Sequence, residues 1–550
     1  MTTTPNCPTC NKEMKLRTRR YDQAKFWGCP NFPRCKGTRR YNENQERQET
    51  NEVNWSEYQL AVFDFVKTGS GNAVVEAVAG SGKTTTILSA LNYTDKNAKV
   101  AFVAFNKRIA TELGNRAPDH VHVSTLHSLG LQNIRNQFGK VKVDNRKFWY
   151  ILNGQSEKLN TSKSTVAPLT QFTKSEQEVL DENGSVIKHI VSLLKMQVME
   201  PTEQNMDWIC DRYGINTNGE RTTIYNAAEL IFTISIKLND VIVDFNDMIH
   251  SPAIGQVQSE KFDFLFVDEC QDLNKAQAKL VLASIHENSR IVAVGDTAQA
   301  IYGFAGADTE SISRLVKDLD AKILPLSICY RCPPNHIELA QQFVPQIQAF
   351  EGKENGTVAH LTFSQMMEIA KSGDLVMCRT NAPLVAPAFE LIRRGIKAVV
   401  LGRDIGTGLQ SLCKKVAKHN SSSTLTELLY DLSEYREIQM RKLIASKKMT
   451  QAAKLDDQVD TIIALAHNAD TIDGLYSKID QVFDDREQGV VFSSIHKAKG
   501  CEADRTFILR PDLVPHKMAT AEWEMEQERN LQYVMLTRSK SEMYFVSGGE

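Results

Sequence analysis

The stretch Ala77-Val-Ala-Gly-Ser-Gly-Lys-Thr84 decides the expected fold. A largely apolar run, residues 74–78, leads into it, and residues 85–91 read Thr-Thr-Ile-Leu-Ser-Ala-Leu, which favours a helix. A strand, a glycine-rich loop and a helix in this order bring backbone N–H groups to the helix N-terminus, where they bind phosphate. The stretch therefore predicts a nucleotide-binding α/β domain.

The individual roles within this loop follow from its pattern. Lys83 is expected to contact the β- and γ-phosphates of ATP, and Thr84 the magnesium ion. Ala77 stands where the strict pattern has its first glycine. The predicted ATP contacts in this stretch are Ala79, Gly80, Ser81, Gly82, Lys83, Thr84 and Thr85.

Two further apolar runs end in acidic residues. Residues 262–267 lead into Asp268 and Glu269, and residues 291–295 lead into Asp296, with Gln299 three positions later. Ligands bind at the carboxyl ends of strands in open parallel sheets. We therefore expect Asp268 to hold magnesium, Glu269 to act as the general base for the attacking water, and Gln299 to sense the γ-phosphate.

Two arginines lie far downstream, Arg331 in Ile-Cys-Tyr-Arg-Cys-Pro and Arg538 in Leu-Thr-Arg-Ser-Lys. Phosphoryl transfer needs positive charge beside the γ-phosphate as negative charge develops there. Arginines supplied by a second domain would couple ATP hydrolysis to domain closure. Cys329 and Cys332 flank the first of them, and we interpret both as core residues because no second cysteine pair lies nearby.

Four cysteines cluster near the N-terminus in the spacing Cys7-x2-Cys10 and Cys29-x5-Cys35. Two close pairs separated by a hairpin-length segment are typical of tetrahedral zinc bound by thiolates. A module this small cannot bury enough core to fold without such a metal.

The same module is basic and aromatic. Residues 1–40 have a formal charge of +8, although the whole chain has a net charge of −2. Localised positive charge indicates a polyanion partner. We predict that Arg17, Arg19 and Trp27 bind single-stranded DNA through phosphate contacts and base stacking. The alternative for Trp27 is that it only packs around the metal.

The bulk composition excludes some classes of protein. Of the 550 residues 42% are hydrophobic and 24% charged, which is ordinary for a globular protein. No apolar run approaches the roughly 18 residues that cross a membrane. The eleven cysteines are scattered beyond the first cluster, unlike a disulfide framework. We expect an intracellular, soluble, cytoplasmic protein in a nucleoid or viral context.

These motifs carry a family resemblance. Residues 53–550 resemble the UvrD/Rep-like superfamily 1 DNA helicases, in particular the short branch that includes the F-box DNA helicases. The matching stretches include Ser124-Thr-Leu-His-Ser, Val267-Asp-Glu-Cys-Gln-Asp, Val294-Gly-Asp-Thr-Ala-Gln, Ser494-Ile-His-Lys-Ala-Lys-Gly and Tyr533-Val-Met-Leu-Thr-Arg. Residues 5–41 resemble the zinc finger at the C-terminus of bacterial type IA topoisomerases.

The helicase resemblance implies two RecA-like domains that move 3′→5′ along single-stranded DNA. It implies that Gln59 reads adenine, that Tyr330 stacks on it and that Glu502 approaches the ribose. It implies that four residues contact or sense the γ-phosphate: Gln271, Gln299, Arg331 and Arg538. It also implies that the path of the DNA strand is lined by Phe105, Thr125, His127, Tyr302, Phe304 and His496.

Three positions depart from the family pattern. Thr85 stands where arginine is common, so one nucleotide contact is expected to be missing. The aromatic residue of the first DNA motif, Phe105, is shifted by one position relative to that pattern. Phe304 replaces tryptophan and keeps an aromatic face.

The expected fold class is α/β, with two RecA-like P-loop domains, mainly helical insertions and a small zinc-ribbon-like module. The expected segments are a zinc finger (1–41), a linker (42–52), the first RecA-like domain (53–126 and 240–325) with its insertion (127–239), and the second (326–404 and 486–550) with a small helical insertion (405–485).

The leading hypothesis is an ATP-dependent DNA helicase or translocase that requires ATP, Mg²⁺ and zinc. Its predicted partners are single-stranded or forked DNA and replication or repair proteins, with no membrane. Because the insertion at 405–485 is small, an alternative is a DNA-stimulated ATPase that strips proteins from DNA or senses DNA within a complex. A third hypothesis is a zinc-dependent DNA-binding protein with an ATP switch, which the intact Glu269 disfavours. RNA stays open as a substrate.

Overall fold

The computed structural model describes residues 7, 10, 12–18, 25–35, 37–40, 54–161, 172–217, 219–303, 310–420, 422–445, 449–467, 469–484 and 489–548. The chain divides into two compact units, Met1–Glu57 and Tyr58–Glu550. The predicted DNA contacts Arg19 and Phe304 lie outside the described residues.

The N-terminal unit contains a three-stranded antiparallel sheet, β1 (Lys15–Thr18), β2 (Lys25–Gly28) and β3 (Thr38–Arg40). Its buried apolar group consists of Met14 and the cysteines, with Trp27 packed against it. This core is very small, as expected for a module that a metal stabilises.

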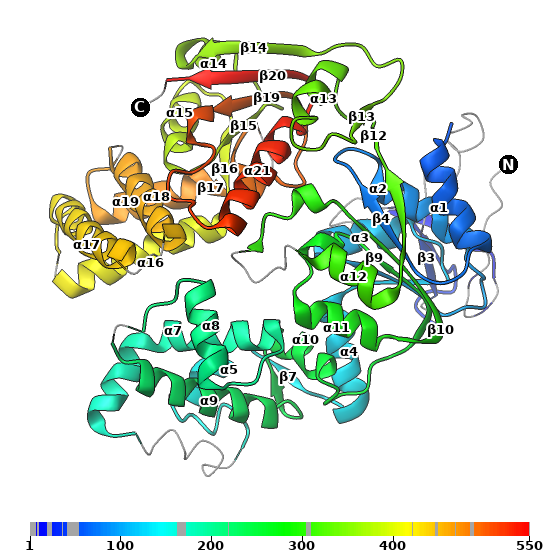
Figure 1. The fold of residues 1–550 in the computed structure, drawn as a ribbon, viewed down its shortest axis with the longest axis horizontal. Helices are drawn as coiled ribbons and strands as arrows, with labels where there is room; N and C mark the ends of the chain where they lie inside the picture. The colour runs from blue at the N-terminus through cyan, green and yellow to red at the C-terminus, as the bar shows by residue number, and fades with distance from the viewer. Residues whose placement is uncertain are drawn as a thin grey trace. The chain divides into compact units, whose positions relative to one another are not determined.

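The larger unit contains two parallel sheets, many of whose strands are labelled in Figure 1. The first has the strand order β11-β4-β10-β9-β5-β6. The inner strands β4, β5 and β9 are almost uninterrupted runs of buried apolar residues, as parallel strands covered on both faces require, whereas the edge strands β6 and β11 are more exposed. Their bounds are β4 Ala73–Ala77, β5 Val100–Ala104, β6 Val121–Thr125, β9 Phe262–Val267, β10 Ile285–Gly295 and β11 Lys322–Leu326.

Helices pack against this first sheet. Leu126 and Leu129 of one of them join Leu265 and Ile291 of the sheet in a common core. That helix is α4. It packs against the sheet, although nearly all of it lies in the segment 127–239, which was predicted to be an insertion. The helices of this part are α1 Glu57–Thr68, α2 Lys83–Ala90, α3 Lys107–Arg116, α4 Leu126–Phe138, α10 Phe245–Ala253, α11 Lys275–Ala283 and α12 Ser311–Leu319.

A helical subdomain lies between β6 and β9 in the sequence. It consists of α5 (Lys147–Leu152), α7 (Lys174–Gln197), α8 (Glu203–Arg212) and α9 (Arg221–Lys237), which share one apolar core, and the short strands β7 (Lys142–Val143) and β8 (Ile242–Val243).

Buried ion pairs join this helical subdomain to α10. The carboxylate of Asp247 lies 2.7 Å from Lys147 Nζ and 2.5 Å from Lys195 Nζ, and all three side chains are almost completely buried. Removing one partner would leave an uncompensated buried charge, so these pairs hold the two parts in one geometry.

The second sheet has the order β14-β20-β19-β15-β18-β16-β17 and is also parallel. Its strands are β14 Thr357–Thr362, β15 Leu375–Cys378, β16 Ala398–Leu401, β17 Phe483–Asp484, β18 Val490–Ser494, β19 Ala503–Leu509 and β20 Ser539–Ser547. Its helices are α13 Pro334–Ala340, α14 Phe363–Ile369, α15 Ala382–Arg393, α20 Ile495–Ala498 and α21 Glu522–Leu536, and a short strand pair consists of β12 Ile328–Cys329 and β13 Gln348–Ala349.

The segment between β16 and β17 is helical, as its apolar spacing predicts. It contains α16 (Arg403–Asn420), α17 (Leu425–Ala445), α18 (Met449–Ala466) and α19 (Ile472–Val482), coloured yellow to orange in Figure 1. Leu428 and Val459 of these helices belong to the same apolar core as Val400 and Phe492 of the second sheet. This helical group is therefore an extension of the sheet's own core.

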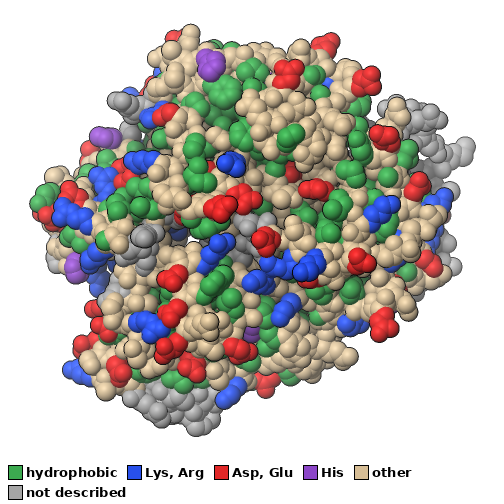
Figure 2. Space-filling model, viewed as in Figure 1, with side chains coloured by type: hydrophobic (Ala, Val, Ile, Leu, Met, Phe, Trp, Pro, Cys, Tyr) green, Lys and Arg blue, Asp and Glu red, His purple; other side chains and the backbone are tan. Residues whose placement is uncertain are grey.

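The predicted α/β fold class, with parallel sheets and a four-cysteine module, is confirmed. Among the described residues, no helix has the length and apolar character needed to span a bilayer. On the face drawn in Figure 2, acidic and basic side chains are interspersed.

Candidate ATP, DNA and zinc sites

The phosphate-side motifs lie together because their strands are parallel and adjacent. β4 ends at the glycine-rich loop, β9 ends before Asp268, and β10 ends before Asp296. In the sheet β10 lies between β4 and β9. The carboxyl ends of these three strands therefore form one site, at the edge where open parallel sheets bind ligands.

The loop after β4 has the backbone of a phosphate site. Gly80 and Gly82 have φ angles of +68° and +76°, which a side chain disfavours. A Cβ atom at Gly80 would lie 2.7 Å from Arg331 Cβ, so only glycine admits this approach. The hydroxyl of Ser81 is buried without a hydrogen-bond partner among the described residues. A phosphate oxygen would satisfy such a group, so the loop fits its predicted ligand.

Lys83, the first residue of α2, points back across this loop. Its ammonium donates to the carbonyls of Ala77 at 3.2 Å and Val78 at 3.3 Å, and it lies 3.7 Å from Asp296 Oδ2. The ammonium group of Lys83 is therefore held between the glycine-rich loop and the acidic residue after β10, where it would contact a bound phosphate.

The two acidic residues after β9 differ in charge environment. Burial, together with the charge of Glu269, raises the pKa of Asp268 to about 7. Burial also acts to raise the pKa of Glu269, but the positive charges of Lys499 and Lys83 outweigh it and lower that pKa. Two adjacent carboxyl groups, of the buried Asp268 and the half-buried Glu269, fit a divalent cation, which would neutralise them and supply positive charge to the phosphates.

Hydrogen bonds link these acids to the strand beside them. Gln271 Nε2 donates to the Glu269 carboxylate, and Gln271 Oε1 accepts from the Asp296 backbone N–H at 3.0 Å. Gln299 Nε2 donates to Asp296 Oδ2 at 2.6 Å. Both predicted γ-phosphate glutamines are thus brought to the site, and each contacts one of its acids.

The second sheet's elements reach the phosphate loop. The backbone N–H of Ala79 donates to the hydroxyl of Tyr533 on α21 at 2.8 Å. The backbone N–H of Tyr330 donates to the carbonyl of Gly80 at 2.9 Å. The phosphate loop is therefore bonded on both sides of Gly80 to the part of the chain that bears the predicted arginines.

The predicted adenine residues are connected in a chain of hydrogen bonds. The Tyr330 hydroxyl donates to Gln59 Oε1 at 3.2 Å, and Gln59 Nε2 donates to Thr86 Oγ1 at 3.0 Å. Thr85, at the departure from the family pattern, is exposed. Gln59 and Tyr330 thus meet beside α2, although they are 271 positions apart.

The two arginines differ in their surroundings. Arg331 pairs with Glu502 at 2.6 Å and donates to the Thr537 carbonyl at 3.1 Å. Arg538 is buried and donates to the Val534 carbonyl at 2.9 Å and to Thr537 Oγ1 at 3.0 Å. Burial, with the nearby charge of Arg331, lowers the pKa of Arg538 to about 10. The guanidinium is thus kept out of water in a fixed orientation.

Aromatic residues predicted to contact DNA lie side by side. The rings of Phe105 and Tyr302 are stacked with their centroids 6.4 Å apart and an interplanar angle of 10°. The Tyr302 hydroxyl donates to the His496 carbonyl at 3.3 Å. Lys499 lies 4.9 Å from the centre of the Tyr302 ring and pairs with Asp272 at 2.6 Å. Lys499 therefore connects the stacked rings of Phe105 and Tyr302 with the acidic residues that follow β9.

Two other predicted DNA contacts lie at the start of α4. The Thr125 hydroxyl accepts from the Ser128 backbone N–H at 3.2 Å and so caps the helix. The ring of His127 meets Phe245 edge to face at 5.8 Å, and burial lowers the pKa of this histidine. Phe245 itself is 53% exposed, an aromatic surface that the sequence reading missed.

A cavity of about 270 Å³ in the second part of the unit was also missed. Its lining combines His496 with basic, amide and aromatic side chains, among them Arg379, Asn381, Trp523 and Gln527. The buried Asn381 Oδ1 and Gln527 Nε2 have no hydrogen-bond partner among the described residues. These residues come from three distant segments, so no local pattern marks them as one site.

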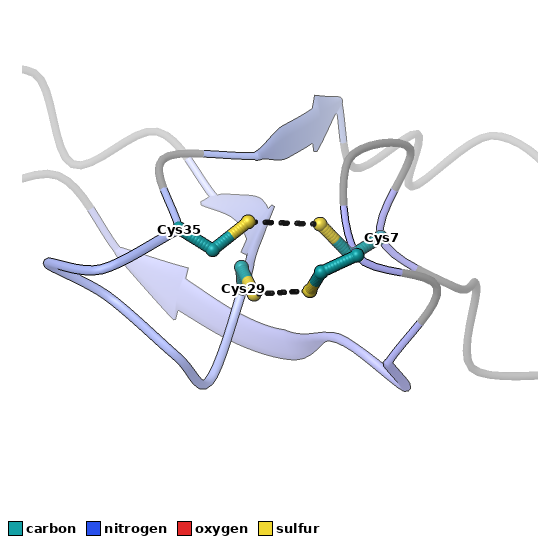
Figure 3. A group of neighbouring side chains, drawn as sticks. Cys7, Cys29 and Cys35 are labelled. Carbon is teal, nitrogen blue, oxygen red and sulfur yellow. Dashed lines mark hydrogen bonds between the residues drawn. The ribbon is translucent and has the colours of Figure 1, made fainter.

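The four N-terminal cysteines converge as their spacing predicts. All four sulfur atoms lie within 4.8 Å of one another, and Figure 3 shows the labelled Cys7, Cys29 and Cys35 pointing to a common centre. Cys7 and Cys35 Sγ are 3.6 Å apart, and Cys10 and Cys29 Sγ are 3.4 Å apart. Thiolates about 2.3 Å from a tetrahedral zinc ion lie about 3.8 Å from one another, so the group fits zinc and is too open for disulfides.

The predicted DNA contacts of this module have different positions. Arg17 on β1 is exposed, and its guanidinium donates to the Cys29 carbonyl at 3.5 Å. Trp27 is half-buried against the cysteines, which favours the packing alternative for this side chain. Phe32, by contrast, is 60% exposed.

Comparison with known families agrees with these sites. Residues 60–320 match the UvrD/REP helicase N-terminal domain, and residues 489–546 match the UvrD-like helicase C-terminal domain. The chain therefore contains both the N-terminal and the C-terminal domain of the UvrD-like helicase family. Residues 5–44 match the topoisomerase DNA-binding C4 zinc finger. Both resemblances predicted from the sequence are confirmed, and the two kinds of domain occur in one chain.

The relatives that this chain matches are distant in sequence. F-box DNA helicase protein 1 of Schizosaccharomyces pombe is 23% identical over 85% of the chain, which spans 55% of that protein. The ATP-dependent DNA helicase PcrA of Bacillus subtilis is 21% identical over 88% of the chain and 81% of its own length. The ATP-dependent DNA helicase Rep of Escherichia coli is 25% identical over 48% of the chain and 39% of its own length.

Proposed function

We propose that this protein is an ATP-dependent DNA helicase that translocates 3′→5′ along single-stranded DNA in repair, replication or recombination. The observation that carries the proposal is the junction between the two sheets. The phosphate loop bonds to Tyr330 and Tyr533, and the same segments bear Arg331 and Arg538. A change at the γ-phosphate would therefore act directly on how the two halves meet.

In the proposed mechanism the two RecA-like domains comprise residues 53–126 with 240–325 and residues 326–404 with 486–550. Residues 79–85 hold the phosphates, with Lys83 neutralising their charge. Asp268 holds Mg²⁺, which supplies charge stabilisation at the phosphates when bound. Glu269 accepts the proton of the attacking water, and Gln299, Gln271 and the two arginines respond to the γ-phosphate.

The Lys499 contacts support a route between hydrolysis and DNA. Lys499 pairs with Asp272, donates to the Gln299 carbonyl at 2.7 Å and lies over the Tyr302 ring. Aromatic faces such as Phe105 and Tyr302 stack on bases without regard to sequence. We infer that a shift of Gln299 with the γ-phosphate moves this aromatic group against the strand.

Duplexes with a single-stranded tail at one end test the direction. With ATP, the protein is expected to unwind a duplex that has a 3′ tail and to leave one with a 5′ tail intact. The Lys83→Ala variant serves as the control that cannot use ATP. Unwinding from 5′ tails would contradict the proposed polarity.

The alternative function is an ATPase that strips proteins from DNA without separating strands. The observation that favours it is the small helical group α16–α19, which shares the second sheet's core and so adds little separate surface for a duplex. DNA-stimulated ATP hydrolysis, together with displacement of streptavidin from biotinylated DNA and no unwinding, would support this alternative.

We further propose that Cys7, Cys10, Cys29 and Cys35 hold zinc and that the finger anchors the protein on DNA. Replacing Cys29 with serine removes one of the four thiolates, so the variant is expected to lose the one zinc ion bound per chain. Structural zinc contributes about 10–16 kcal/mol to the folding of such modules, so the finger should unfold as well. DNA affinity of the full chain should fall, and ATP hydrolysis at saturating DNA should continue. The zinc content of the purified protein measures the loss of metal, and fluorescence anisotropy with labelled DNA measures the change in DNA affinity.

The matched control is Cys501→Ser, a half-buried cysteine outside the cluster. It should retain zinc. Full zinc content in the Cys29→Ser variant would contradict the assignment of the metal site.

A further inference from the structure

The bend at residues 379–381 joins β15 to α15 at the carboxyl edge of the second sheet. Arg379 and Asn381 in this bend line the cavity that also contains His496. The position of the bend therefore decides how these two side chains face whatever enters the cavity.

Helix α15 begins without a side-chain cap of its own. Its N-cap residue is Asn381, whose side chain makes no capping hydrogen bond, and Pro383 in its first turn has no N–H to satisfy. Open N–H groups at a helix start need an acceptor.

Asp457 on α18 supplies that acceptor from 76 positions away. Its Oδ1 accepts from the backbone N–H groups of Asn381 at 2.7 Å and Ala382 at 3.1 Å, and its Oδ2 accepts from Asn381 Nδ2 at 2.7 Å. One carboxylate thus fixes both the backbone of the bend and the amide of Asn381. Burial raises the pKa of Asp457, and these hydrogen bonds act against that rise.

A second carboxylate holds the other end of the bend. Arg379 donates to both oxygens of Glu528 on α21 at 3.0 Å, in a paired geometry that restricts the guanidinium. The same carboxylate accepts from the His516 backbone N–H at 2.9 Å. The bend is therefore held between α21, which leads to Arg538, and α18 of the helical group.

We propose that Asp457 is a positioning residue for DNA binding, through which the helical group α16–α19 holds the 379–381 bend in the geometry that receives the strand. The proposal rests on the proposed function, in that it takes single-stranded DNA to occupy this cavity. It gives the small helical group a role that does not depend on contact with a duplex.

The test compares Asp457→Ala and Asp457→Asn with Asp460→Asn in the full chain. Asp460 lies on the same helix, but its carboxylate is 51% exposed and pairs with Arg436 at 2.7 Å. Binding of a fluorescent oligothymidylate and the ATP hydrolysis that it stimulates are measured for each variant. Hydrogen exchange of the backbone around residues 381–382 is measured without DNA.

For Asp457→Ala, the oligothymidylate Kd and the half-saturating DNA concentration should rise about tenfold, equal to 1.4 kcal/mol. Turnover at saturating DNA should fall far less, since the reacting groups are elsewhere. Exchange around residues 381–382 should accelerate. Asp457→Asn keeps one acceptor oxygen, so it should restore the protection and most of the affinity. Asp460→Asn should match the parent protein.

Two results would overturn the proposal. Unchanged exchange in Asp457→Ala would show that the carboxylate does not hold the bend. Accelerated exchange with DNA affinity within about twofold of the parent would show that the bend does not serve DNA binding. If the parent protein itself fails to bind oligothymidylate, the proposed DNA function fails instead, and the exchange data still report on the bend.

Discussion

Replacing Glu269 with glutamine is expected to lower DNA-stimulated ATP hydrolysis by about 10²- to 10⁴-fold, the usual contribution of a positioned general base. The amide keeps the shape of the side chain and loses its ability to take a proton from water. Because Lys83 and the loop are untouched, ATP should still bind. Steady-state hydrolysis and binding of a fluorescent ATP analogue separate the two effects.

The matched control is Glu260→Gln, whose carboxylate lies before the opposite end of β9 and pairs with Lys99 at 2.9 Å. This variant should hydrolyse ATP normally. If Glu269→Gln retained more than about a tenth of the parent rate, another group would have to act as the base.

Replacing Arg538 with alanine is expected to lower hydrolysis by about 10³- to 10⁵-fold, the range typical of an arginine that stabilises the phosphoryl-transfer transition state. The structure gives this residue an unusual setting for a cation, since it is buried and held by Val534 and Thr537. Its charge therefore acts in a medium that screens it little.

Arg538→Lys distinguishes charge from shape. Lysine keeps a positive charge but lacks the planar fork of donors, so most of the loss should remain. Arg441→Ala, at an exposed position on α17, is the control. Thermal melting of each variant checks the fold, because Arg538 also bonds the C-terminal end of α21. Normal hydrolysis by a folded Arg538→Ala protein would exclude the proposed role.

Much of this architecture was predictable from local patterns. Apolar runs that end at Asp268 and Asp296 predicted buried strands with acids at their carboxyl ends, and the structure has both. The segment 405–485 was expected to be helical, and Leu428, Leu432 and Val459 of its helices are completely buried. These features depend on short-range periodicity, which a single sequence displays.

The contacts between distant segments were not predictable in the same way. Nothing in the sequence around Asp457 marks it as the cap of a helix that begins at Ala382, and no motif pairs Lys147 with Asp247. Polar residues in helices are usually solvated, and only tertiary packing determines which of them are buried against a partner. The cavity at Arg379 was missed for this reason.

The aromatic residues show the limit of composition as a guide. Trp27 lies among basic residues, which favoured DNA binding, yet its ring packs against the cysteine cluster. A very small module has few apolar groups, so its tryptophan is needed for the core. Among the described aromatic residues of this module, Phe32 is the one with a largely exposed side chain.

The most direct test of the central claim is ATP hydrolysis by the full chain with and without single-stranded DNA. The Lys83→Ala and Glu269→Gln variants are measured beside it. The predicted result is that DNA strongly stimulates ATP hydrolysis by the parent protein and that both variants lose this hydrolysis. This result would establish an ATP-driven motor that acts on DNA. Hydrolysis that does not respond to DNA would contradict the account.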